Sequence, residues 1–262
     1  MMGRIWAIAL NTFREAARIR VLYGILVLVV AANLLAVVLG QLSVHEESRV
    51  ARDIGLAGIS LFGSLTAIFL GVFLLYTEIQ RRTIHAIVSK PIERWEFVIG
   101  KYLGMVLVLS VLVVLFGLAM AGMLVWQGDS VTAAVLKALV LSWLEVLVVA
   151  ALAIFFSSFS TPFLSGIFAL GIWAIGRVTP DIEAATKATS GAIRLVTKAA
   201  LEIVPDLHLF SVSGSTLEGS TVSVHGDFVS WGYVGLASLH GLGWIVGLVA
   251  LAAILFQRRD FV

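Results

Sequence analysis

The sequence contains no cysteine and few charged side chains: only 13% of its 262 residues are Asp, Glu, Lys or Arg. The lack of cysteine excludes disulfide bonds, thiolate metal ligands and a cysteine nucleophile. Soluble domains carry about 25% charged residues, so the shortage of charge excludes a water-soluble globular protein. The 60% of hydrophobic residues and the mean hydropathy of +1.04 indicate a multi-pass membrane protein instead.

The chain also lacks the G-x-x-x-x-G-K-[ST] motif that holds the phosphates of ATP. Its Gly/Ser-rich stretch, residues 211–220, contains no lysine, and the apolar runs leave no room for a nucleotide-binding domain. These absences exclude a self-contained ATP-driven pump. The 18 basic residues nearly balance the 16 acidic ones, which gives no sign of a nucleic-acid surface. The histidines show no metal-ligand spacing such as H-x-x-x-H.

Six apolar stretches are long enough to cross a membrane as helices, which takes about 17–25 residues each. They cover residues 21–40, 54–77, 102–126, 131–156, 161–178 and 232–256. The fifth begins at Pro162 and ends at Arg177. It fits either a short tilted helix whose Arg177 side chain extends to the outer interface or a re-entrant segment. We therefore predict an all-α polytopic membrane protein with six transmembrane helices.

The distribution of Lys and Arg predicts the orientation of these helices. If all six cross and the N-terminus lies inside, eleven of the 18 basic residues fall on the inner side, as the positive-inside rule requires. This predicts an N-in/C-in arrangement and a single transmembrane domain over residues 1–262. Residues 1–20 form a basic amphipathic pattern before the first span, which predicts an interfacial helix.

The densest charge lies in the inner loop of residues 78–101, which holds five basic and three acidic side chains. Apolar residues at helical spacing predict a short helix that ends at Pro91, and a new helix is expected to begin at Glu93. A short, charged, amphipathic helix between two spans suits a docking surface for a soluble partner. A solvated loop anchored by positive-inside charges fits the pattern equally well.

The outer segment of residues 178–231 is the longest stretch outside the predicted spans. Thr179 is expected to cap a helix that starts at Pro180 and ends at Pro205, with apolar residues repeating at helical spacing. This pattern predicts an amphipathic helix at the outer interface. Residues 211–230 are rich in Ser, Gly and Thr, and their Thr-Val-Ser-Val alternation predicts a short strand or hairpin.

Glu145 lies near the middle of the fourth predicted span, where a carboxylate costs about 2.5–3.5 kcal/mol on insertion scales. Counted from the inner ends, Asn33 lies at a similar depth and His240 about one turn further out. Our hypothesis is that Glu145 lines or gates a translocation pathway, near Asn33 and His240. The alternative is that Glu145 joins helices through hydrogen bonds. Two glycine pairs favour close helix packing or a dimer seam: Gly100/Gly104 and Gly243/Gly247.

The inner loop carries the run Glu78 … Thr83 … Ser89-Lys90-Pro91-Ile92 … Arg94 … Phe97 … Gly100-Lys101 … Gly104. This run resembles the first intracellular loop of ABC-2 type transporter permeases. Three further stretches resemble the branch of multicopper-enzyme-maturation and nitrous-oxide-reductase-accessory permeases: residues 11–15, 156–162 and 256–261. The resemblance covers nearly the whole chain.

The resemblance implies an interfacial N-terminal helix, six spans, a coupling helix in the first inner loop and short outer helices between spans five and six. It also implies an exporter in a bacterial or archaeal plasma membrane, built as a homodimer or paired permease and driven by two copies of a separate ABC ATPase. That ATPase would bind ATP and Mg²⁺, and this chain would bind no cofactor or metal and have no catalytic residue. The expected ATPase-coupling residues are Glu78, Arg81, Arg82, Thr83, Ile84, Ile87, Ser89, Lys90, Pro91 and Arg94.

The outer segment departs from the family pattern, because its 54 residues exceed the family's usual short hairpin. An extracytoplasmic partner at residues 178–231 is therefore a further expectation. Two other classes also fit a multi-pass chain without an ATP site: a stand-alone secondary transporter or channel, and a membrane scaffold or assembly factor. A secondary transporter is expected to contain inverted repeats, and the sequence contains no clear internal repeat.

Overall fold

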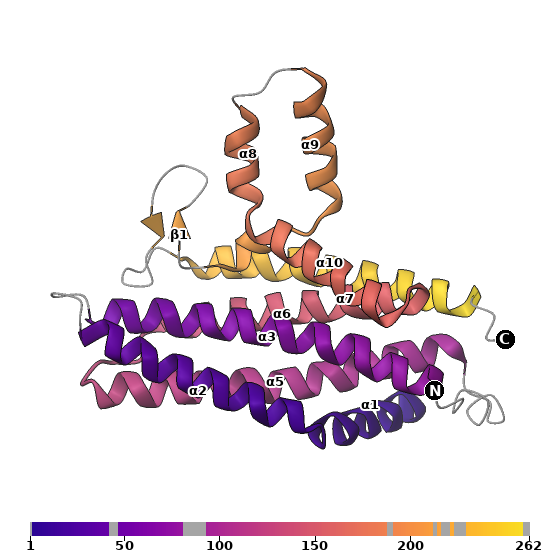
Figure 1. Ribbon diagram of the computed structural model, residues 1–262, viewed down its shortest axis with the longest axis horizontal. Coiled ribbons are helices and arrows are strands. Elements are labelled where there is room, and N and C mark those ends of the chain that lie inside the picture. Colours follow the sequence, from indigo (N-terminus) through magenta and orange to yellow (C-terminus); the bar gives the residue numbers. More distant parts are fainter. Residues whose placement is uncertain are drawn as a thin grey trace.

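The apolar runs of the sequence form a bundle of long helices that lie side by side, with the start of α1 and the end of α10 at the same end (Figure 1). The computed structural model describes residues 2–41, 47–80, 93–187, 191–211, 214–215, 221–222 and 229–258. The elements in chain order are α1 (Met2–Ala17), α2 (Arg20–Gln41), α3 (Glu47–Gln80), α5 (Arg94–Trp126), α6 (Ala133–Phe159), α7 (Pro162–Arg177), α8 (Thr179–Lys187), α9 (Ala192–Ile203), the 3₁₀ helix η1 (Leu207–Phe210), β1 (Gly214–Ser215), β2 (Thr221–Val222) and α10 (Trp231–Arg258).

Four of the described helices, α3, α5, α6 and α10, are each long and apolar enough to cross a membrane. Two consecutive pairs pass the same test together but are bent, α1 with α2 by 65° and α7 with α8 by 63°. The described residues therefore contain four to six candidate spans, and the predicted all-helical multi-pass class is confirmed. The six predicted spans correspond to α2, α3, α5, α6, α7 and α10. We call the end of the bundle that holds α1 the inner end, following the charge distribution.

Helix α6 is the centre of the bundle, because it packs against α3, α5, α7 and α10. Every side chain from Val146 to Ile154 is buried. A helix that is apolar all round is expected to be covered on all sides, and α6 shows this arrangement.

The starts of two helices follow local signals in the sequence. Helix α5 begins directly after Glu93, as predicted, and Glu93 and Glu96 form a capping box that satisfies exposed backbone N–H groups. Helix α7 begins with Pro162, whose missing N–H is not needed in the first helical turn.

Helix α1 packs along the first turns of α5, so the predicted interfacial helix is held against the bundle. Gly104 makes this approach possible, because a Cβ atom there would lie 2.5 Å from Cβ of Thr12 and 2.7 Å from the carbonyl oxygen of Ala9. Gly100 provides the same room one turn earlier, against Ile8. The first glycine pair thus serves a seam within the chain, between α1 and α5.

The structure divides the predicted outer helix into two helices, α8 and α9. Gly191, directly before α9, has a φ of +86°, a backbone conformation that a helix cannot continue through. Thr179 is the first residue of α8, and its hydroxyl donates to the carbonyl oxygens of Ile175 and Gly176 in α7, in place of the predicted cap. Figure 1 shows α8 and α9 as a hairpin that stands out from the side of the bundle.

The chain returns from this hairpin to the bundle through η1, which packs against α6 and α7. Leu207 and Phe210 of η1 are buried, and Gly241 of α10 leaves room for the Phe210 ring, which would lie 3.0 Å from a Cβ atom there. Beyond η1, β1 and β2 pair antiparallel, which confirms the short hairpin predicted within residues 211–230.

Candidate functional site

Three helices bring polar side chains together in the middle of the bundle. Glu145 is the thirteenth of the 27 residues of α6, Ser60 lies near the middle of α3, and Arg177 is the last residue of α7. At 1.5 Å per residue, Glu145 lies about 18 Å from the outer end of α6 and about 21 Å from its inner end. The cluster therefore lies near the midplane of any membrane that the bundle crosses.

The carboxylate of Glu145 accepts hydrogen bonds from three residues. Arg177 Nη1 lies 3.0 Å from Oε1 and 3.1 Å from Oε2. The Ser60 hydroxyl donates to Oε2 at 2.6 Å, and the Trp173 indole N–H donates to Oε1 at 3.3 Å. Arg177 Nη1 also lies 2.6 Å from the Ser60 hydroxyl oxygen, so one closed network joins α3, α6 and α7.

Burial explains why the carboxylate needs so many donors. Glu145 is 0% exposed, whereas the side chain of Arg177 is 27% exposed. Removing a carboxylate from solvent costs several kcal/mol, which an opposite charge and good hydrogen bonds compensate. The adjoining cavity has a volume of about 10 Å³, room for one water molecule at most. In this conformation the cluster joins helices and is too tight for a substrate.

The position of Arg177 corrects one of the two sequence-based alternatives for α7. A side chain that extends to the outer interface would point away from the bundle, but Arg177 instead binds Glu145 near the midplane. Helix α7 therefore ends near the middle of α6, and the chain turns sideways into α8.

The structure does not bring Asn33 and His240 to this cluster. Asn33 is buried between α2 and α3, where its amide donates to Val29 O at 2.8 Å and lies beside Gly55. His240 is exposed on α10, with its ring edge-on to Trp244 at 6.4 Å. Glu145 has the geometry of the helix-joining alternative, and a role of the three residues in transport stays a prediction.

Sequence reasoning missed the partners of Glu145. Arg177 was the detectable one, because only it and Lys137 are basic among the residues of the predicted spans. Pairing opposite charges at equal depth would have selected Arg177, since Lys137 lies near the outer end of its span. Ser60 and Trp173 carry no such signal, as hydroxyl and indole groups are common in apolar helices.

Lys137 and Arg52 hold the outer end of the bundle together. The buried Lys137 donates to Val229 O at 2.8 Å and lies over the Trp231 ring, 5.3 Å from its centroid. Arg52 of α3 forms an ion pair with Asp129 in the turn between α5 and α6. Both contacts tie one helix to the start or end of another.

Most of the expected ATPase-coupling residues fall outside the described residues. These are Arg81, Arg82, Thr83, Ile84, Ile87, Ser89, Lys90 and Pro91. Glu78 lies in the last turn of α3, and Arg94 is the first residue of α5. Arg94 Nη1 donates to Gln257 O of α10 at 3.1 Å, and Lys101 binds Glu15 of α1 at 3.2 Å.

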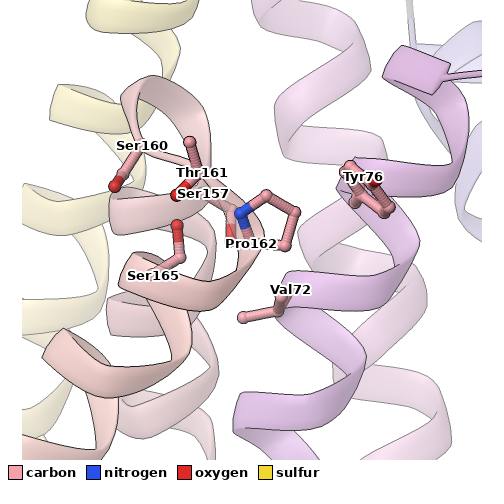
Figure 2. A pocket seen from close by; sticks show the side chains of 7 residues that line it. All are labelled: Val72, Tyr76, Ser157, Ser160, Thr161, Pro162 and Ser165. Atoms are coloured by element: carbon pink, nitrogen blue, oxygen red, sulfur yellow. The ribbon is translucent and has the colours of Figure 1, made fainter.

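A small cavity of about 160 Å³ lies between α3 and the turn from α6 to α7. Figure 2 shows Val72 and Tyr76 of α3 on one side and Pro162 on the other, with Ser157 and Ser165 beside the proline. Among the described residues, the hydroxyls of Ser157 and Ser165 have no hydrogen-bond partner. The cavity wall is mostly apolar, but a cavity of this size can hold a few water molecules beside these two hydroxyls.

Among the described residues, no three His, Asp or Glu side chains are grouped as metal ligands.

Asp206 lies between α9 and η1. Burial raises the pKa of its carboxyl group above the ordinary value, and the backbone N–H of His208, which donates a hydrogen bond to the carboxylate at 3.1 Å, opposes that shift.

The chain matches the model of a known protein family. The family model described as "ABC-2 family transporter protein" matches residues 6–261, a range that runs from the first turns of α1 to beyond the end of α10. Comparison with curated protein sequences yields no match.

Proposed function

This chain belongs to the ABC-2 family of transporter proteins, and from that premise we propose an exporter in which two permease copies work with two copies of a separate ATPase. Membership makes the chain the membrane-embedded permease component of an ABC-2 transporter, without catalytic activity of its own and with the ATPase on another subunit. The secondary transporter, channel and scaffold alternatives are thereby set aside. Three statements go beyond family membership and are our proposal. The permease works as a homodimer or a paired permease, the partner ATPase binds ATP and Mg²⁺, and the complex lies in a bacterial or archaeal plasma membrane.

We infer that the ATPase docks on the inner loop of residues 78–101, at the coupling residues from Glu78 to Arg94. Helix α3 ends at Gln80 and α5 begins at Arg94, so residues 81–92 connect two of the longest helices. The bond from Arg94 to Gln257 and the ion pair from Lys101 to Glu15 link α5 to α10 and α1. A displacement of this loop would therefore reach four helices at once, and this linkage is the observation that carries the docking proposal.

The test reverses the charge of the loop with the double variant Arg81→Glu/Arg82→Glu. Like charges placed against a complementary surface cost several kcal/mol, so co-purification of the ATPase with the permease should fall by roughly tenfold or more. Membrane insertion, followed by the yield of folded permease, should be unchanged.

Arg18→Glu/Arg20→Glu is the matched control, because these two residues are exposed at the turn between α1 and α2 and give the same change of charge. Equal loss in both variants would indicate a general effect of inner charge. Undiminished co-purification of the ATPase with the Arg81/Arg82 variant would refute docking at this loop.

We further infer that the chain belongs to the multicopper-enzyme-maturation and nitrous-oxide-reductase-accessory branch, on the strength of residues 11–15, 156–162 and 256–261. An extracytoplasmic partner would then bind within the outer segment of residues 178–231, on the part that follows the α8–α9 hairpin. An ATPase gene and a periplasmic or extracellular maturation protein encoded beside this chain would support the branch, whereas an unrelated neighbourhood would count against it.

A further inference from the structure

The hairpin of α8 and α9 leaves the bundle near the depth of Glu145, well inside its outer end. Arg177 contacts Glu145 at 3.0 Å, and α8 begins two residues later. Glu145 lies about 18 Å inside the outer end of α6, and α8 turns away from α7 by 63°. Figure 1 shows the hairpin at the side of the bundle, crossing the direction of α10. In a single copy, the hairpin would therefore lie among lipid tails.

The hairpin carries side chains that lipid tails do not accommodate. Charged groups in hydrocarbon are costly, and they face protein or water wherever they occur inside membranes. The exposed charged residues of the hairpin are Asp181, Glu183, Arg194, Lys198 and Glu202. None of them takes part in the salt bridges that the structure shows within its described residues.

An uncovered apolar face accompanies these charges on α9. Leu195 is 74% exposed, Val196 66% and Ile203 75%, although they occupy one side of a strongly amphipathic helix. Among the described elements, the substantial contacts of the hairpin are between α8 and α9 and between α8 and η1. The spanning helices of the same copy therefore leave this face open to another protein surface.

The charges divide between the two helices in a way that favours a second copy of this chain. Helix α8 carries Asp181 and Glu183 with the single basic residue Lys187, and α9 carries Arg194 and Lys198 with the single acidic residue Glu202, so the net charge is −1 on α8 and +1 on α9. In a two-fold pair the same surface patch meets itself, and among such arrangements the one that places α8 of one copy against α9 of the other brings opposite net charges together. Acidic and basic helices then meet twice. A lipid surface would match the apolar face but would leave the acidic helix without a partner.

We propose that the α8–α9 hairpin is the arm by which two copies of this chain hold each other, with acidic α8 of one copy against basic α9 of the other. The proposal rests on the paired permease of the proposed function and names the surface that makes the pair.

The test uses two oppositely charged variants in differently tagged copies. The hairpin of residues 179–203 contains three acidic and three basic residues. Arg194→Glu/Lys198→Glu changes its net charge from zero to −4, and Asp181→Lys/Glu183→Lys changes it to +4. Each variant should pair with itself roughly tenfold less than the original chain, because like charges then face each other. When the two variants are produced together, pairing between them should return to near the original level.

Recovery of pairing when the two variants are produced together distinguishes a real interface from damage to the hairpin. The like charges within each altered hairpin are still present in the mixed sample, so a damaged hairpin would not recover. Ser130→Lys, an exposed position in the turn between α5 and α6, is the control for added outer charge and should leave pairing unchanged. Normal self-pairing of both variants would overturn the proposal. So would loss without recovery, which would assign the hairpin to lipid or to another protein. Co-purified ATPase is measured in the same samples, so that failure of the proposed function is seen separately.

Discussion

Breaking the Glu145–Arg177 pair from its two sides should have unequal effects on stability. In Arg177→Met the carboxylate keeps only Ser60 and Trp173 as donors and stays fully buried. Loss of one partner of a buried ion pair costs about 3–5 kcal/mol in soluble proteins. Partners found in the membrane-inserted unfolded state reduce such values, so we expect a loss of about 3 kcal/mol of unfolding free energy.

The opposite variant, Glu145→Met, should cost less. This change leaves Arg177 without its ion-pair partner. The Arg177 side chain is already 27% exposed, and its long apolar stem lets the guanidinium reach water. We expect a loss of about 1–2 kcal/mol for this change. The double variant removes both charges, and because apolar replacement of a buried pair is often neutral, it should lie within about 1 kcal/mol of the original chain.

Unfolding by SDS in mixed micelles measures all four proteins, and the double-mutant cycle yields the coupling energy between the two side chains. The reasoning fails if Arg177→Met costs less than about 1 kcal/mol, or if the double variant loses the sum of the single losses. Transport is a separate readout. Glu145→Gln with undiminished transport and transport-coupled ATP hydrolysis would refute a gating role while leaving the stability argument in place.

Two further variants test the packing of the bundle. Gly104→Leu places a side chain where Cβ alone would lie 2.5 Å from Thr12, so it should lower the unfolding free energy by about 1–3 kcal/mol and make α1 sensitive to protease. Gly122→Leu, on the same helix with nothing within 4 Å, should do neither, and equal effects would contradict the seam. Lys137→Met removes the bond to Val229 O and should cost about 1–3 kcal/mol in the same SDS titration, whereas an unchanged transition would show that the contact contributes nothing.

The course of the chain could be predicted from its sequence wherever a local signal marks a boundary. Pro162 and Glu93 each lie at the start of a predicted helix and start one in the structure. Gly191 is a similar signal that the sequence reasoning passed over. A glycine after Ser190 inside an amphipathic pattern favours a break, and the structure has a positive φ there.

The depth at which α7 ends could not be predicted in the same way. The composition of α7 is compatible with a span that reaches the outer interface, and an arginine at its end is typical of that arrangement. What decides the outcome is the register between α6 and α7, which brings Arg177 to Glu145. That register depends on packing between the two helices, so the sequence of neither helix alone predicts it.

The two glycine pairs make the same point about packing. Gly100/Gly104 and Gly243/Gly247 have identical spacing, yet α1 fills the room at the first pair while nothing lies within 4 Å of the second. Spacing indicates that a helix can approach closely. The neighbouring chain determines which helix, if any, does so.

Ion pairs, which we call clasps, join the helices at three positions along the bundle. Arg52 pairs with Asp129 at the outer end, Glu145 with Arg177 in the middle and Lys101 with Glu15 at the inner end. Only the middle clasp holds α7, the helix that leads directly into the proposed dimer arm. A movement that carries α7 outward together with the arm would therefore separate Arg177 from Glu145 and leave the Arg52–Asp129 and Lys101–Glu15 pairs intact. Among the described residues Glu145 is the most deeply buried carboxylate, and in the proposed dimer its pairing with Arg177 would oppose displacement of the arm.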